Sequence, residues 1–173
     1  MNMYVCFHLL WLFHLNLCTS TPVLSAVPGT LSATKFLTEA KDPIIFPVPN
    51  TNAVLKIFFG PPVDPHTLTT LFAVSISAIS NAAALFGEDV VLPHRPLSEV
   101  SDGYAFSIGR THGGRLTWAL ARDAVSGMRQ FYIERKDWRC IAVQVWESWE
   151  GKRWRVGDAI IRPEPKDDGD SPN

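Results

Sequence analysis

Residues 116–146 constrain the fold more than any other part of the sequence, because an amphipathic helix pattern is followed there directly by a strand pattern. Within residues 117–133, apolar side chains recur at steps of three and four, with polar side chains between them. Thr117 precedes this run and can accept a hydrogen bond from a free amide of the first turn. The pattern predicts a helix with a buried face that carries Met128 and Phe131, and a solvated face that carries Arg129.

Gly127 lies inside this predicted helix. Glycine costs about 1 kcal/mol relative to alanine in a helix interior. One interpretation is that another backbone or a bulky ring approaches the helix closely at this position. The other is that the glycine is a tolerated imperfection.

The strand pattern covers residues 140–146 and is apolar nearly throughout, which is typical of a strand inside a sheet or covered on both faces. A turn over residues 148–152 contains Gly151 and leads into a second run over residues 153–161. These two runs predict an antiparallel hairpin with a longer loop, and Gly157 is a candidate β-bulge. We expect the helix to pack against Val143 and Val145.

Three further elements precede this segment. Residues 53–59, with the sequence AVLKIFF, predict a first core strand, and residues 104–108 predict another. Residues 65–87 contain no charged residue and predict a long helix. A membrane span is the alternative for this helix, but polar residues are spread through its middle and no basic flank orients it, so we favour a helix within the domain. Residues 90–102 are interpreted as a loop.

The predicted element order is strand, helix, strand, helix, strand, strand. Connections through helices favour parallel neighbouring strands, whereas the last two strands form an antiparallel hairpin. The sequence therefore predicts an α+β fold with a mixed four-stranded sheet and two helices packed on one face. The element order does not match the ferredoxin-like arrangement.

The ends of the chain differ in composition from this predicted domain. Residues 1–20 contain no acidic or basic side chain and an apolar run, which predicts a signal peptide and a secreted, extracellular protein. A membrane anchor is the rival interpretation, although the run is shorter than the ~20 residues that a span needs. Residues 21–50 predict a flexible arm rich in Pro, Ser and Thr, residues 51–162 a single domain, and residues 163–173 a disordered acidic tail.

Charge and cysteine content restrict the possible functions. The formal net charge of the 173 residues is -1, which gives no electrostatic reason to expect nucleic acid as a partner, or a membrane after signal cleavage. Removal of residues 1–20 leaves Cys140 as the only cysteine, so no internal disulfide is available. We interpret Cys140 as a small buried apolar residue in preference to a reactive nucleophile.

A glycine-containing turn precedes the helix of residues 117–133. A turn of this kind between a strand and a helix can bind an anion through backbone amides and cationic side chains. It lacks the lysine of a Walker loop and the three-glycine spacing of a dinucleotide loop. The alternative is a plain surface loop. The residues that we assign to the possible anion site are Arg110, His112, Gly113, Gly114 and Arg115.

Tryptophans gather around the predicted hairpin among lysines and arginines. Aromatic rings among cations can stack on sugars or bases. The alternative is that most of these rings cover the core of the sheet. The residues that we assign to the possible binding surface are Trp138, Trp149, Trp154 and Arg153.

No set of residues specifies a reaction. The histidines of residues 21–173 do not lie at metal-ligand spacing from one another or from Cys140, so we expect no metal site and no cofactor. Asp102, Asp123, Glu147 and Glu150 are available to form a carboxylate pair, but acidic residues in such positions are typically solvated.

One resemblance adds to these patterns. It rests on Phe59-Gly60-Pro61-Pro62 after the first strand, Leu116-Thr117-Trp118 at the start of a helix, Gly127 to Phe131 near its end, and the strand of residues 143–146. Over residues 53–162 the chain resembles a family of short, signal-bearing proteins of unknown function in filamentous fungi. The resemblance implies secretion and a shared fold, and it assigns no catalytic residue.

Two functional hypotheses follow. The first is a secreted, non-enzymatic protein that binds an extracellular ligand or partner. The second is a small enzyme or binder that takes an anionic or sugar ligand at the turn formed by residues 109–115.

Overall fold

The structure, a computed structural model, describes residues 42–164. The predictions for residues 1–20, for most of the arm and for nearly all of the tail therefore lie outside the described residues. The elements are β1 (Ile44–Pro47), β2 (Ala53–Pro62), α1 (Pro65–Phe86), β3 (Leu97–Ser101), β4 (Tyr104–Arg110), α2 (Trp118–Arg135), β5 (Arg139–Trp149) and β6 (Lys152–Pro163).

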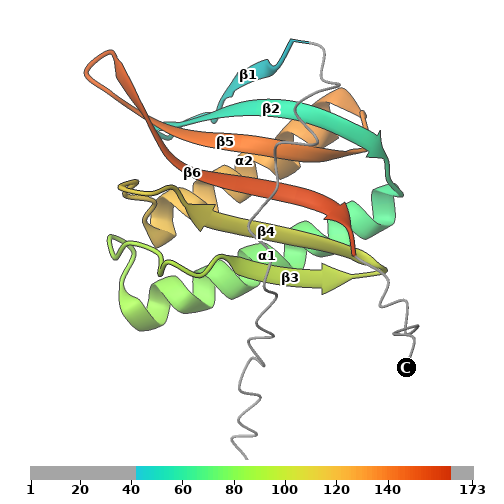
Figure 1. Ribbon diagram of the computed structural model, residues 1–173, viewed down its shortest axis with the longest axis horizontal. Coiled ribbons are helices and arrows are strands. Elements are labelled where there is room, and N and C mark those ends of the chain that lie inside the picture. Colours follow the sequence, from blue (N-terminus) through green and yellow to red (C-terminus); the bar gives the residue numbers. More distant parts are fainter. Residues whose placement is uncertain (1–41, 165–173) are drawn as a thin grey trace, which may run out of the picture. The chain divides into compact units, whose positions relative to one another are not determined.

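Within residues 42–164, six strands form one sheet in the order β1-β2-β5-β6-β4-β3, and every neighbouring pair is antiparallel (Figure 1). The prediction of a mixed four-stranded sheet is therefore wrong, although the class is α+β. It assumed that each helix returns the chain to a neighbouring parallel strand. Instead β2 lies beside β5, and β3 begins a separate hairpin at the far edge.

The two missed strands are the edges of the sheet. Strand β1 lies within the predicted proline-rich arm, and prolines are tolerated at an edge because one side of the strand makes no ladder bonds. Strand β3 lies within the predicted loop and reaches β4 through Asp102 and Gly103, which both have positive φ, at 51° and 73°. This is the two-residue Asp-Gly turn that fits hairpin twist.

The central hairpin differs from the prediction in its turn. Glu150 and Gly151 have φ of 49° and 76° and form a two-residue connection between β5 and β6, which is shorter than the loop expected. The pairing shifts between Val145, opposite Gly157, and Trp146, opposite Arg155. The bulge predicted near Gly157 is thus confirmed.

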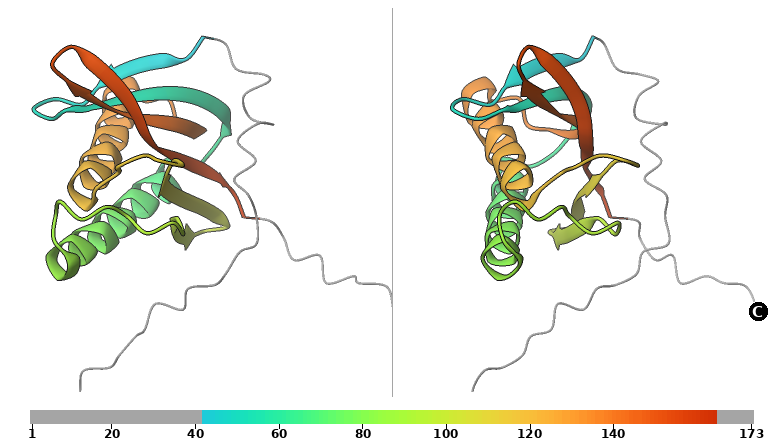
Figure 2. Two further views of the ribbon diagram at one scale, coloured as in Figure 1. Left: turned by 60° about the vertical axis from the view of Figure 1, so that its left-hand side comes forward. Right: turned by 90° about the vertical axis from the view of Figure 1, so that its left-hand side faces the viewer.

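Both helices lie on the same side of the sheet, as the two views of Figure 2 show. Thr117 accepts a hydrogen bond from the Leu120 amide at 3.2 Å, which confirms it as the N-cap of α2. Asp64 caps α1 by accepting from the amides of His66 at 2.8 Å and Thr67 at 3.2 Å. These caps satisfy amides that have no partner within their own helices.

The buried face of α2 is the one predicted from the sequence, since Met128 and Phe131 are both fully buried. The ring of Phe131 lies 5.4 Å from that of Phe46 in β1 and 5.9 Å from that of Phe59 in β2, measured between centroids. The next residue, Tyr132, lies 5.5 Å from Phe72 of α1. Helix α2 approaches β2 more closely than it approaches the strand that follows it.

Helix α1 has the length and composition of a membrane span, and 33% of its most apolar window is buried. In the structure it packs against α2 and against β3 and β4. Leu68, Leu71 and Phe72 are fully buried or nearly so. The helix therefore forms part of the domain's core.

Gly127 marks a close approach. A Cβ atom at this position would overlap both γ-carbons of Val48, the farther of which would lie only 3.0 Å away. Val48 follows β1, so the missing side chain of Gly127 lets the start of the sheet pack against α2. Of the two interpretations of Gly127, close approach is correct, and the approaching group is a valine side chain.

We predict that Gly127→Ala lowers the free energy of unfolding by about 1 to 3 kcal/mol, the usual cost of overpacking a core. Denaturant titration measures this loss. Val48→Ala in the same chain removes the overlap, so in that background Gly127→Ala costs less or becomes stabilising. The exposed neighbour Ser126→Ala is the control. A stabilisation of about 1 kcal/mol by Gly127→Ala alone, the gain in helix propensity, would contradict the prediction.

Candidate functional site

The face of the sheet turned away from the helices carries the candidate site. Successive side chains of a strand point to opposite faces. Leu55 of β2 and Val145 of β5 belong to the core beneath the helices. Their neighbours Val54, Lys56 and Trp146 therefore point to the other face, which we call the open face.

A depression of about 160 Å³ lies on the open face. Strand pairing builds it, because Ile45 is opposite Lys56, and Val54 is opposite Trp146. Arg153 reaches it from β6, since its partner Ser148 lies two residues beyond Trp146 on the same face of β5. The lining residues are Ile45, Val54, Lys56, Trp146 and Arg153.

The depression combines an apolar floor with two cations. Neither Lys56 nor Arg153 forms an ion pair within residues 42–164. The Lys56 Nζ atom lies 5.5 Å from the ring centroid of Phe58, on the same face, a cation-π distance. Both positive charges are thus free of a carboxylate partner in the described part of the chain.

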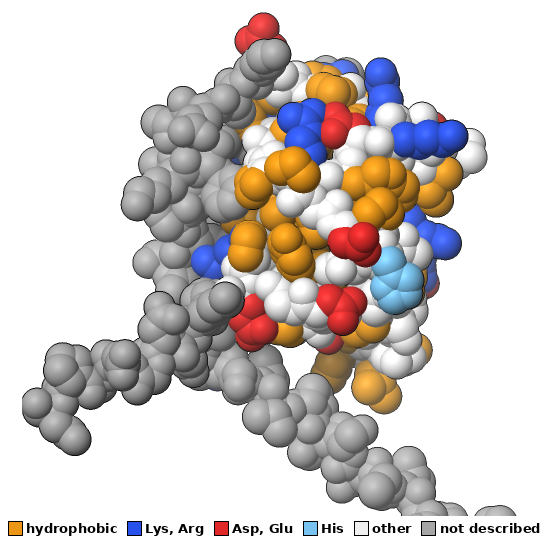
Figure 3. All heavy atoms as spheres, turned by 90° about the vertical axis from the view of Figure 1, so that its right-hand side faces the viewer, with side chains coloured by type: hydrophobic (Ala, Val, Ile, Leu, Met, Phe, Trp, Pro, Cys, Tyr) orange, Lys and Arg blue, Asp and Glu red, His pale blue; other side chains and the backbone are white. Residues whose placement is uncertain are grey.

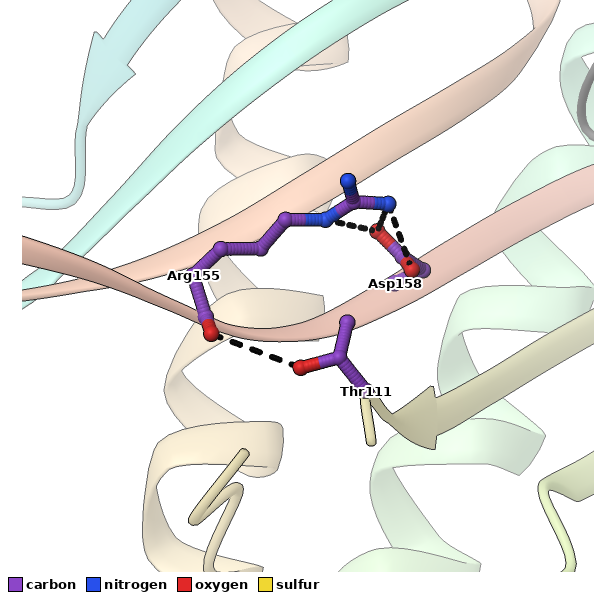
Figure 4. A network of polar contacts seen from close by, with 3 residues as sticks. All are labelled: Thr111, Arg155 and Asp158. Atoms are coloured by element: carbon purple, nitrogen blue, oxygen red, sulfur yellow. Dashed lines mark hydrogen bonds and ion pairs between the residues drawn. The ribbon is translucent and has the colours of Figure 1, made fainter. Parts of the chain in front are cut away.

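Arg155 is also on the open face, opposite Trp146, but its guanidinium already forms an ion pair within the protein. Its guanidinium donates to both carboxylate oxygens of Asp158, with nitrogen to oxygen distances of 2.7 to 2.9 Å (Figure 4). The Thr111 hydroxyl donates to the Arg155 carbonyl at 3.4 Å. This pairing leaves Lys56 and Arg153 as the cations available to a ligand in the depression.

Trp146 contributes a polar group as well as its ring. Its indole Nε1 is buried, and it has no hydrogen-bond partner within the described residues. A buried donor without a partner costs about 1 to 3 kcal/mol, and native structures contain few of them. A hydrogen-bond acceptor bound to this nitrogen would recover that cost.

Another surface is mixed in character. Figure 3 faces the end of the molecule at which β2 ends and α1 begins, on the right of Figure 1. Hydrophobic, acidic and basic side chains alternate over the coloured part of this view. No single charge sign dominates there, whereas the depression carries cations alone.

The predicted anion site lies in the connection from β4 to α2, where His112, Gly113 and Arg115 are exposed. The amide of Gly114 donates to the Thr111 carbonyl at 2.9 Å, so it closes a turn of the chain. A Cβ atom at Gly114 would overlap the carbonyl oxygen of Val156. Glycine is therefore required at this position by packing of the turn against β6.

The backbone amides at the amino end of α2 also donate hydrogen bonds to acceptors within the protein. The amide of Trp118 donates to the Val90 carbonyl at 3.1 Å, and that of Ala119 donates to the Glu88 carbonyl at 3.0 Å. The amide of Leu120 donates to the capping hydroxyl. Anion binding at Arg110, His112, Gly113, Gly114 and Arg115 stays a prediction, and its donors would be side chains together with the amide of Gly113.

The four residues assigned to a binding surface lie in three places. Trp138 stacks on Tyr132 with ring centroids 5.7 Å apart, at the edge of the core. Trp149 and Trp154 are 57% and 48% exposed near the tip of the β5–β6 hairpin. Arg153 lines the depression on the opposite face of that hairpin.

Sequence reasoning missed Lys56, Trp146, Ile45 and Val54 as one site. The sequence feature that could have indicated this face is Lys56, because it is the only charged residue in the strand sequence AVLKIFF. A single lysine in a core strand marks the face that is not covered by helices. The contribution of β1 had no signal, since that strand was not predicted.

The geometry of the described residues gives little support to metal binding or to catalysis by a cysteine nucleophile. No group of three or more His, Cys, Asp or Glu side chains in residues 42–164 is placed to hold a metal ion. Cys140 is a free, fully buried cysteine. Burial raises the pKa of its thiol to about 11, which disfavours the reactive thiolate at neutral pH.

We predict that Cys140 in the native chain resists alkylation by iodoacetamide at neutral pH, because the thiol is both buried and protonated. Peptide mapping by mass spectrometry after timed labelling measures its modification. Labelling in guanidinium chloride is the control, and there the same cysteine should react fully. Equal rates in the native and unfolded chains would show that this strand is accessible and would contradict its placement in the core.

Comparison of the chain with protein-family models, with curated proteins and with solved structures finds no match.

Proposed function

We propose that this chain is a secreted, non-enzymatic binding protein whose ligand is a small organic anion with an apolar body. The observation that supports the proposal most directly is the depression on the open face. There Lys56 and Arg153 lie beside Ile45, Val54 and Trp146. The carboxylate of a ligand would pair with the cations, and its apolar body would lie against the aliphatic side chains and the indole.

The size of the depression limits the ligand. Its volume of about 160 Å³ is below the range of about 300 to 1,000 Å³ that is typical of sites for drug-sized molecules. A short aliphatic or a single-ring aromatic carboxylate is therefore the expected class of ligand. A longer molecule would place only one end there.

The side chains that line the depression favour binding over catalysis. Acid–base catalysis is carried most often by imidazole and carboxylate groups, and covalent catalysis uses hydroxyls, thiols and lysine amines. Lys56 is the one residue of these types in the lining. The lining supplies an ammonium, a guanidinium, an indole and two aliphatic side chains. These groups orient and neutralise an anion.

The ligand experiment uses benzoate, phenylacetate and hexanoate, with the corresponding neutral amides for comparison. Tryptophan fluorescence and chemical shifts of the indole N–H groups report binding. We expect the carboxylates to bind and the amides to bind at least tenfold more weakly, about 1.4 kcal/mol. Lys56→Gln with Arg153→Gln should reduce carboxylate affinity at least tenfold, and added salt should weaken binding to the unaltered chain.

Two variants separate the depression from other surfaces. Arg129→Gln alters an exposed arginine on α2 and should leave the affinity unchanged. Arg115→Gln alters the turn of residues 109–115, so an effect confined to this variant would place the anion there and reject the depression. Failure of every carboxylate to bind at millimolar concentration would reject the proposal.

Secretion is proposed from residues 1–20, which precede the described part of the chain. Expression with the native leader in a secreting eukaryotic host, followed by mass measurement of the culture fluid, tests it. We expect a product that lacks about twenty amino-terminal residues. Recovery of the intact chain only from membranes would support the anchor interpretation instead.

A further inference from the structure

The tip of the β5–β6 hairpin projects beyond the rest of the sheet. Strand β2 pairs with β5 only as far as Glu147, and β4 pairs with β6 only as far as Gly157. Beyond these positions β5 and β6 continue to pair with each other up to Trp149 opposite Lys152. Within residues 42–164, only the base of this ribbon is hydrogen-bonded to other segments, through Ser148 to Asn52 and through Val156 to Thr111. In Figure 1 this two-stranded ribbon extends at the upper left, past the start of β2.

Two tryptophans share one face of this ribbon. Trp154 is opposite Glu147, and Trp149 is opposite Lys152, so the four side chains lie on the same face. The indoles occupy one diagonal, with Cβ atoms roughly 7 to 8 Å apart, and the charged groups occupy the other. We call these four residues the indole face. It is the reverse of the face that carries Trp146 and Arg153.

The indole face is not part of the core. Trp149 and Trp154 are about half exposed, and neither belongs to the buried hydrophobic cluster of the domain. Tryptophan normally buries a large apolar area. Two of them on a projecting ribbon therefore form a surface suited to a flat partner.

The charges on the ribbon select the kind of partner. Glu147 and Glu150 accompany Lys152 on or beside the indole face. Carboxylates at this position repel a polyanion such as nucleic acid or an anionic lipid surface. A surface that attracts polyanions carries basic residues without acidic neighbours. A neutral ligand with many hydroxyl groups meets no such opposition. Its hydroxyls can donate to the carboxylate and accept from the ammonium.

We propose that the indole face binds a neutral polysaccharide. The C–H faces of two sugar rings stack on Trp149 and Trp154, and Glu147 and Lys152 hydrogen-bond the hydroxyls at their edges. This site is separate from the depression, since the side chains that form the two surfaces point to opposite faces of the hairpin. Its ligand is a neutral chain, whereas the ligand of the depression is a small anion.

The experiment titrates the full chain with soluble hexamers of β-1,4-glucose, β-1,3-glucose and N-acetylglucosamine. Isothermal titration calorimetry reports binding, because this readout does not depend on the tryptophans that the variants remove. We expect at least one hexamer to bind, with affinity little changed by added salt. The double variant Trp149→Ala/Trp154→Ala should lose at least tenfold in affinity and keep the native fold, which its circular dichroism spectrum checks, because both rings are about half exposed and neither belongs to the buried cluster.

Two control variants test whether sugar binding is specific to the indole face. Leu85→Ala removes an exposed apolar side chain on α1, which is 79% accessible, and should bind sugars normally. Lys56→Gln with Arg153→Gln should also bind sugars normally, so failure of the anion proposal and failure of this one can be told apart. The proposal is overturned if no hexamer binds, or if the double tryptophan variant binds as well as the unaltered chain. Salt-sensitive binding to anionic vesicles through the two tryptophans would overturn it in favour of a membrane surface.

Discussion

The fold depends on a chain of aromatic contacts centred on two successive residues of α2. Phe131 packs against Phe46 from the edge strand β1, and Tyr132 packs against Phe72 from α1. The Tyr132 hydroxyl donates to the carbonyl of Arg139, at the start of β5. One turn of one helix therefore joins the sheet edge, the second helix and the central hairpin. Each large ring buries about 150 to 250 Å² of surface, which makes this cluster a principal source of stability.

Around this cluster the same supersecondary unit occurs twice. Strands β1 and β2 with α1, and strands β3 and β4 with α2, are each a hairpin followed by a helix, and the β5–β6 hairpin lies between the inner strands β2 and β4. The open face exists because both helices cover the same side of the sheet (Figure 2). The depression forms where β1, β2 and the central hairpin meet on the side turned away from the helices.

Local features of this structure were predictable, and long-range pairing was not. The cap at Thr117 follows from a preference that acts within a few residues. The unfavourable glycine at Gly127 indicated that a close approach was one of two possibilities, but it did not identify Val48 as the partner. The pairing of β2 with β5 joins residues that are 77 positions apart at Pro62 and Arg139 and 94 apart at Ala53 and Glu147, and no local periodicity encodes it. Two signals were overlooked, namely the Asp102-Gly103 turn that defines β3 and the lone charge of Lys56. The exposure of Trp149 and Trp154 agrees with a surface role, but only strand register separates them from Arg153.

The position of β5 and β6 in the middle of the sheet has a consequence for the order of folding. These strands are synthesised after the other described elements, yet β2 and β4 depend on them for one full side of their hydrogen bonds. Until they arrive, the earlier hairpins expose unpaired strand edges, which are templates for aggregation. Productive folding is therefore expected only after synthesis of the whole domain. A chain of this design benefits from being kept unfolded until its carboxyl-terminal hairpin is available.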